Sequence, residues 1–143
     1  MATIRRHANA VWHGTGKDGS GTLTTQSGTL KDTPYSFRMR FGDAAGTNPE
    51  ELIAAAHAGC FSMALAFQLS GAGHQPDSIQ TEARLTMEQE GEGWKIAAVH
   101  LVLRAKVPGL DRAAFEDLAG KAKAGCPVSK VLNATITLDA TLE

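Results

Sequence analysis

The sequence feature that most constrains the fold is a long run without charged side chains. Residues 52–69 read LIAAAHAGCFSMALAFQL and include no Asp, Glu, Lys or Arg. A run of about 18 residues approaches the length of a membrane span. This one, however, is rich in Ala and Gly, contains His57, Ser62 and Gln68, and has no basic flank. We therefore expect a helix buried inside protein.

The start and the end of this helix are marked in the sequence. Asn48 suits an N-cap, Pro49 fits the first helical position, and Glu51 stands three residues after the cap. We predict a helix from Pro49 to Leu69 that stops at the glycines of residues 71–73. Because it is apolar on nearly every side, one small sheet cannot cover it. A second layer of structure, or a partner subunit, has to do so.

Alternating segments separated by glycine-rich turns flank the helix. They predict strands at 8–13, 22–26 and 35–41, a hairpin of 79–88 and 94–106, helices from Asp111 and Pro127, and a last strand at 135–142. Period-two spacing in the third strand puts Arg38 and Arg40 side by side, opposite its aromatic residues. The order β-β-β-α-β-β-α-α-β, without repeats or linkers, indicates one α+β domain over residues 1–143.

Charge and composition narrow the classes of function. The chain has 143 residues, a formal net charge of -1, and 43% hydrophobic against 20% charged residues. This balance is that of a soluble globular protein. It provides no basic field for nucleic acid or anionic lipid, so we expect neither as a partner. The N-terminal residues are too polar for a secretory signal, which makes the cytoplasm the expected location.

The sequence has two cysteines, Cys60 and Cys126. A reducing cytoplasm disfavours a permanent structural disulfide, so both can simply be buried small side chains unless their surroundings indicate reactivity. Cys60 lies within the apolar helix, where burial raises a thiol pKa, and a reactive Cys60 needs a group that stabilises its thiolate. Arg40 is the candidate, with Glu50 holding its guanidinium in a two-pronged ion pair. That Arg40 reaches Cys60 is a hypothesis about tertiary structure.

Cys126 has different surroundings. It precedes Pro127 at a predicted helix start, where free N–H groups favour a thiolate, and it follows Gly125. Mobility and access to a partner sulfur are what a resolving cysteine requires.

Two longer motifs carry a resemblance. The run GTNPEELIAAAHAGCF (46–61) and the run AKAGCPVS (122–129) resemble the two cysteine motifs of the OsmC/Ohr family of hydroperoxide reductases, and their separation agrees. The runs PYSFRMRF (34–41) and ITLD (136–139) are similar to the OsmC branch. The resemblance covers essentially the whole chain.

The resemblance implies an OsmC-like fold in an intertwined homodimer with active sites at the subunit interface. It implies that Cys60 attacks the hydroperoxide and becomes a sulfenic acid, that Cys126 resolves it as a disulfide, and that Arg40 and Glu50 activate Cys60. An external dithiol, such as one of the lipoyl type, then restores the thiols. No bound cofactor or metal is implied, and the role is defence against oxidative and osmotic stress. Arg38 is expected to be a solvated surface charge.

Apolar neighbours of Cys60, among them Phe61 and Met63, suggest a pocket that favours organic hydroperoxides over hydrogen peroxide. Three other functions have partial support in the sequence. A metal site could use His57, Cys60 and Cys126, but no paired-ligand motif is present. The GKDG loop (16–19) has the GxxG form of an RNA-binding module, but it lies between predicted strands. CPVS (126–129) resembles a glutaredoxin-type motif, but it follows a helix.

Overall fold

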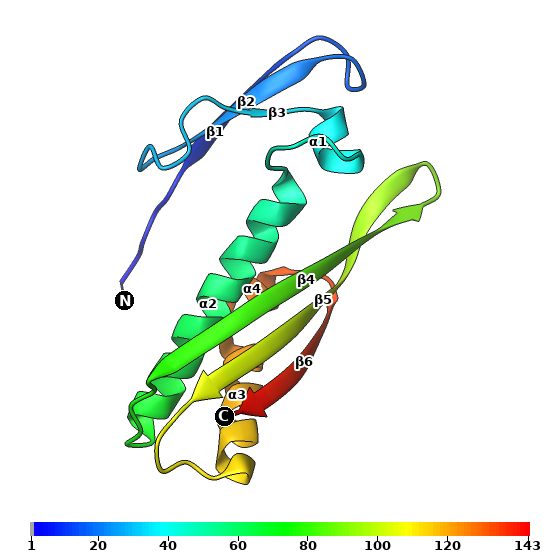
Figure 1. Ribbon diagram of the computed structural model, residues 1–143. Coiled ribbons are helices and arrows are strands. Elements are labelled where there is room, and N and C mark those ends of the chain that lie inside the picture. The colour runs from blue at the N-terminus through cyan, green and yellow to red at the C-terminus, as the bar shows by residue number, and fades with distance from the viewer. Residues whose placement is uncertain (1) are drawn as a thin grey trace. The chain divides into compact units, whose positions relative to one another are not determined.

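The computed structural model describes residues 2–143, which divide into two compact units (Figure 1). The first unit ends at Leu52, and the second is Ile53–Glu143. In chain order the elements are β1 (Ala8–His13), β2 (Ser20–Thr25), β3 (Thr33–Tyr35), α1 (Phe37–Phe41), α2 (Pro49–Gly71), β4 (Ser78–Glu90), β5 (Gly93–Lys106), α3 (Arg112–Gly125), α4 (Pro127–Val131) and β6 (Thr135–Leu142). Helix α2 begins in the first unit and continues into the second.

The first unit is built on a small antiparallel sheet in the order β1-β2-β3. The prediction of a strand over residues 35–41 is wrong, because the strand ends at Tyr35 and residues 37–41 form the short helix α1. The Ser36 hydroxyl caps this helix by accepting a hydrogen bond from the N–H of Met39. Arg38 and Arg40 therefore do not lie side by side, since residues two apart on a helix point to different sides.

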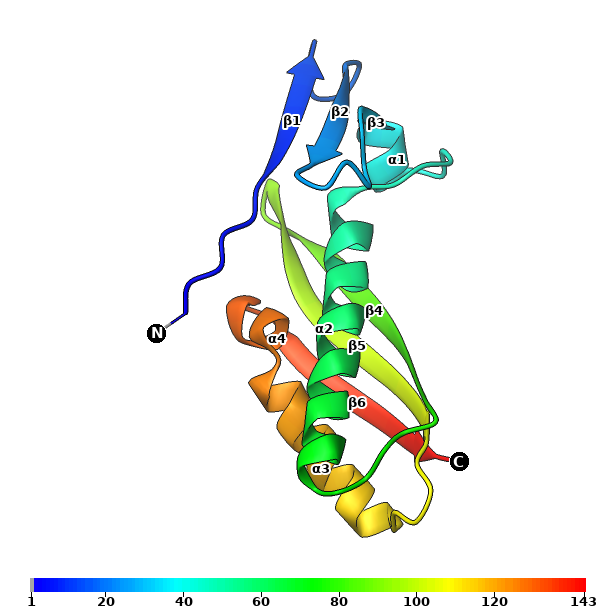
Figure 2. The same cartoon turned by 90° about the vertical axis from the view of Figure 1, so that its left-hand side faces the viewer.

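The second unit has a three-stranded sheet in the order β4-β5-β6. Strands β4 and β5 form the predicted hairpin, and β6 pairs with β5 in parallel. Helices α2 and α3 lie on one face of this sheet (Figure 2). Helix α3 begins at the predicted cap, where Asp111 Oδ1 accepts a hydrogen bond from the N–H of Ala114 at 2.8 Å.

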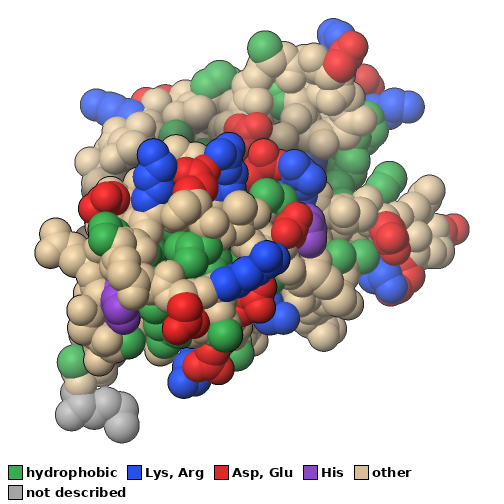
Figure 3. All heavy atoms as spheres, turned by 60° about the horizontal axis from the view of Figure 1, so that its bottom comes forward, with side chains coloured by type: hydrophobic (Ala, Val, Ile, Leu, Met, Phe, Trp, Pro, Cys, Tyr) green, Lys and Arg blue, Asp and Glu red, His purple; other side chains and the backbone are tan. Residues whose placement is uncertain are grey.

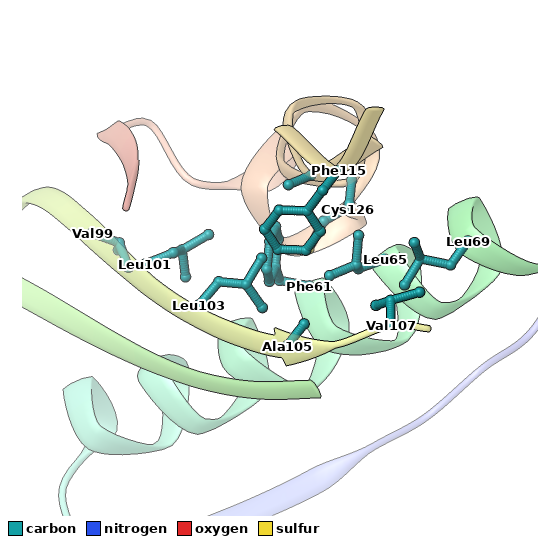
Figure 4. Close-up of a cluster of buried hydrophobic side chains, with 12 residues drawn as sticks. Phe61, Leu65, Leu69, Val99, Leu101, Leu103, Ala105, Val107, Phe115 and Cys126 are labelled. Atoms are coloured by element: carbon teal, nitrogen blue, oxygen red, sulfur yellow. The ribbon is translucent and has the colours of Figure 1, made fainter. Parts of the chain in front are cut away.

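The core of the second unit lies between β5 and the helices α2 and α3 (Figure 4). Alternate residues of β5 point into it, as expected of a strand with one buried face. Helix α2 contributes apolar side chains spaced four residues apart. The fully buried side chains include Phe61, Leu65, Leu69, Val99, Leu101, Leu103, Phe115, Ala119 and Cys126.

Helix α2 starts as predicted, because Asn48 Oδ1 accepts a hydrogen bond from the N–H of Glu51 at 2.8 Å. It is long and apolar enough to span a membrane by length and composition alone. Only one stripe of it is buried, while Met63 and Phe67 on another side are 65% and 72% exposed. The expectation that the helix is covered on every side is therefore not met within one chain.

His57 is the one polar side chain among the described residues that is fully buried. It lies on the buried stripe of α2, and its Nε2 forms a 2.8 Å hydrogen bond with Ser129 Oγ of α4. Burial lowers the pKa of His57 below its ordinary value of 6.5, because an apolar environment disfavours the charged imidazolium.

This lowered pKa predicts an acid-sensitive fold. The unfolded chain protonates His57 at about pH 6.5, whereas the folded chain holds it neutral to lower pH. Protons therefore bind preferentially to the unfolded chain, and stability should fall as pH drops from 6.5 through the folded pKa. Denaturant titrations at several pH values should show a flatter dependence for His57→Gln than for wild type. The control variant His7→Gln, at an exposed site, should keep the wild-type dependence of stability on pH. The wild-type dependence in His57→Gln would contradict the role given to His57.

Candidate active site

The two cysteines meet although they are far apart in sequence. Cys60 lies on α2 and is half-buried, and Cys126 is the N-cap residue of α4. Both are free thiols, and Cys126 Sγ donates a hydrogen bond to Cys60 Sγ across 2.7 Å. A disulfide requires about 2.04 Å, so only a small movement is needed for the two sulfurs to bond once one of them has been oxidised. The side chain of Cys126 is fully buried and has no contact with solvent. Its access is to the partner sulfur.

The surroundings of Cys60 have opposing effects on its pKa. Burial raises the pKa of the thiol, and its interaction with the neighbouring Cys126 thiol raises it further. The backbone N–H of Val128, which hydrogen-bonds to Cys60, lowers it. The effect of burial was expected from the sequence, but the contribution of Val128 was not. The sequence feature that could have indicated this contact is the start of a helix at Pro127. Helix α4 has no side-chain cap, so the backbone N–H groups of its first turn are available to other partners.

A second contact joins the same two helices. His57 lies three residues before Cys60, and Ser129 lies three residues after Cys126, so their 2.8 Å hydrogen bond is about one helical turn from each cysteine. His57 was a candidate residue in the sequence, but its pairing with Ser129 was not expected. The equal three-residue spacing within the two motifs is the signal that could have suggested it.

The predicted pair of Arg40 and Glu50 is present within the first unit. Arg40 Nε and Nη2 donate to Glu50 Oε1 and Oε2 at 2.8 and 3.0 Å, a two-pronged ion pair. Hydrogen bonding to Glu50 raises the pKa of Arg40, so the guanidinium stays charged. The guanidinium also lies 5.1 Å from the centre of the Phe41 ring. Cys60 and Cys126 both lie in the second unit.

Arg38 differs from Arg40. Its side chain is 77% exposed and forms a 3.9 Å ion pair with the almost fully exposed Asp43. Ion pairs between such exposed side chains contribute little to the stability of the fold. The expectation that Arg38 is a solvated surface charge agrees with this geometry.

Arg40 also borders an apolar cavity of about 500 Å³ in the first unit. The aromatic side chains that line it come from β1, β3 and α1: Trp12, Tyr35, Phe37 and Phe41. Gly21 lets two of them approach, because a β-carbon there would lie 2.6 Å from the Trp12 ring and 2.7 Å from the Tyr35 ring. The chain therefore has an apolar cavity next to a fixed cation.

The apolar pocket expected around Cys60 from its neighbours in sequence does not form in that way. Phe61 is fully buried in the core, and Met63 is exposed on another side of α2. Neighbours in a helix point in different directions, so Phe61 serves packing.

The alternative functions find little support in the geometry. Within residues 2–143, no group of three or more His, Cys, Asp or Glu is arranged to hold a metal ion. The GKDG loop connects the antiparallel strands β1 and β2, and Cys126 follows α3 directly. On the face drawn in Figure 3, basic and acidic side chains are intermingled and form no basic patch.

Comparison with known proteins gives consistent results. The sequence model of the family "OsmC-like protein" matches residues 42–141. The chain is 49% identical to the peroxiredoxin OsmC of Escherichia coli over 99% of both chains. It is 31% identical to an organic hydroperoxide resistance protein of Xanthomonas axonopodis, over 91% of this chain and 92% of the relative.

Solved structures agree on the fold. A crystal structure of an organic hydroperoxide resistance protein OsmC from Legionella pneumophila superposes with a TM-score of 0.73, at 27% identity over 99% of both chains. OhrB of Bacillus subtilis gives a TM-score of 0.71, at 27% identity over 96% of this chain and 98% of that one. The chain therefore belongs to the OsmC family.

Proposed function

We propose that this protein is a cysteine-based peroxidase that reduces organic hydroperoxides to alcohols. The observation that carries the proposal is the 2.7 Å approach of the Cys60 and Cys126 sulfurs, both free thiols, from two different helices. Its relatives, a peroxiredoxin and organic hydroperoxide resistance proteins, support the same chemistry.

In the proposed reaction the Cys60 thiolate attacks the outer oxygen of the hydroperoxide. The O–O bond breaks, the alkoxide takes a proton and leaves as an alcohol, and the sulfur keeps one oxygen as a sulfenic acid. The Cys126 sulfur then attacks the Cys60 sulfur, and the S–O bond breaks. The oxygen leaves as water, and a disulfide forms. An external dithiol, such as one of the lipoyl type, restores both thiols by exchange, without a bound cofactor or metal.

Arg40 stabilises the negative charge that builds on the leaving oxygen, and Glu50 fixes the direction of the guanidinium. The ion pair supports this role because both of its hydrogen bonds are well formed and Glu50 is only 12% exposed. The cavity beside Arg40 provides an apolar site for the organic part of a substrate. Hydrogen peroxide has no such part, so we expect it to be the poorer substrate.

We further propose that two chains form a homodimer. The support is α2, whose exposed Met63 and Phe67 leave an apolar helix face uncovered in one chain. A second copy that covers this face would account for both side chains. Within the proposal, residues 1–143 act as one OsmC-like domain in the cytoplasm, with no membrane or nucleic-acid partner, and contribute to defence against oxidative and osmotic stress.

The roles of the cysteines are tested by replacing each one. Cys60→Ser should abolish turnover of cumene hydroperoxide with a dithiol, because the attacking sulfur is gone. Cys126→Ser should consume about one equivalent of peroxide and then stall as a sulfenic acid that oxidises further. Peroxide consumption and intact-mass spectrometry measure both. Substantial turnover by Cys60→Ser, or wild-type steady-state turnover by Cys126→Ser, would overturn the assignment.

The role of Arg40 has a matched control in Arg38. Arg40→Met should lower kcat/KM for cumene hydroperoxide by about a hundredfold, the effect of removing one group that stabilises transition-state charge. Arg38→Met should stay close to wild type. The same assay with hydrogen peroxide as the substrate tests the proposed preference for organic hydroperoxides. An equal loss of kcat/KM in Arg40→Met and Arg38→Met would argue against a specific role for Arg40.

The dimer is tested at the exposed face of α2. Phe67→Asp should shift the protein towards monomer in light scattering at micromolar concentration, because a charge would be buried in the interface. Val131→Asp replaces another exposed apolar residue, on α4, and should leave the oligomeric state as in wild type. A wild-type protein that is monomeric under these conditions contradicts the proposal.

A further inference from the structure

Two parallel contacts connect α4 to α2. One joins Cys126 and Cys60, and the other joins Ser129 and His57. Within each helix the two contacting residues are three apart, which is about one turn. The second contact therefore determines how α4 is placed along and around α2, and with it the position of the Cys126 sulfur.

Helix α4 has few other attachments to hold this position. It has only five residues, and none of them is buried. Val131 is 77% exposed, and Val128 is the residue of α4 that packs against the core as a partly buried side chain. Apolar packing alone therefore constrains α4 weakly. A directional hydrogen bond to a fully buried side chain constrains it much more.

His57 is suited to this role because it is rigid and uncharged. Its ring is fully buried on the stripe of α2 that packs in the core, and burial keeps it neutral. Its Nδ1 has no hydrogen-bond partner among residues 2–143. A neutral imidazole has one N–H, and an unpaired buried N–H is costly. The arrangement therefore favours the tautomer in which Nε2–H donates to Ser129 Oγ.

We infer that His57 and Ser129 form a positioning pair that keeps Cys126 within reach of Cys60 during the resolving step of the proposed peroxidase reaction. The inference rests on that proposed function. Once Cys60 is a sulfenic acid, two reactions compete for it. Attack by the Cys126 sulfur breaks the S–O bond, releases water and forms the disulfide. A second hydroperoxide instead transfers an oxygen to the sulfur, giving a sulfinic acid and an alcohol. A loosely held α4 slows only the first of these reactions.

The experiment measures how oxidised Cys60 divides between these two products. Wild type, Ser129→Ala, Ser129→Thr and the double variant His57→Leu/Ser129→Ala are treated with a graded series of cumene hydroperoxide. Intact mass distinguishes the products, because the disulfide has lost two hydrogens and the sulfinic acid has gained two oxygens. Lys130→Ala, at the exposed position next to Ser129 on α4, is the matched control.

Ser129→Ala should raise the ratio of sulfinic acid to disulfide about five-fold, which corresponds to the loss of one typical buried hydrogen bond. Ser129→Thr, which keeps the hydroxyl, should return the ratio towards wild type, and Lys130→Ala should match wild type. The double variant leaves no unpaired partner, so its fold should tolerate the change while its ratio stays high.

Thermal unfolding of the same reduced proteins separates positioning from general stability. A lower Tm for Ser129→Ala with a wild-type product ratio would overturn the inference, because the bond would then serve only the fold. The same ratio in Ser129→Ala and Ser129→Thr would also overturn it. If wild type itself forms no disulfide between Cys60 and Cys126, the proposed function fails, and the inference fails with it.

Discussion

The packing of α2 on the sheet of the second unit is the interaction on which the described site depends. Four side chains spaced four residues apart, His57, Phe61, Leu65 and Leu69, form the buried stripe of this helix. The three apolar members of this stripe pack in the same core as alternate residues of β5. Because interiors are close-packed, such a stripe allows one rotation of the helix about its axis. That rotation buries His57 and directs Cys60 to the edge of the stripe, where α4 can reach it.

The site combines a thiol that resists ionisation with groups that favour the thiolate. Burial and the neighbouring thiol raise the pKa of Cys60, and the N–H of Val128 opposes them. A buried thiol is protected from unspecific reaction, but it needs charge stabilisation to attack a peroxide. Arg40, held by Glu50, is the cation that the proposed mechanism brings to this task. The requirement for such a group follows from the environment of Cys60 and not from the family assignment alone.

Much of the fold could be predicted from local pattern. The caps at Asn48 and Asp111, the β4–β5 hairpin and the last strand all occur where the sequence indicated them. Residues 35–41 were the exception because they satisfy two patterns. Their aromatic residues alternate as in a strand, but Phe37 and Phe41 are also four residues apart, and their rings lie 4.9 Å from each other in a helix. Two features favour the helix. Ser36 caps it, and the pairing of β3 with β2 extends over only three residues.

The sequence by itself determined which residues can carry the chemistry: two cysteines in distinctive motifs, an arginine and a glutamate that can form an ion pair, and an uncharged helix that needs cover. Only the tertiary structure decided that Cys126 is buried against Cys60 and that Ser129 meets His57. The physical reason is the distance along the sequence over which the interactions act. Caps, turns and periodicity depend on neighbours within a few residues, whereas these contacts join segments about one half of the chain apart. Their geometry comes from the packing of α2 and α3 on one sheet, which no local pattern specifies.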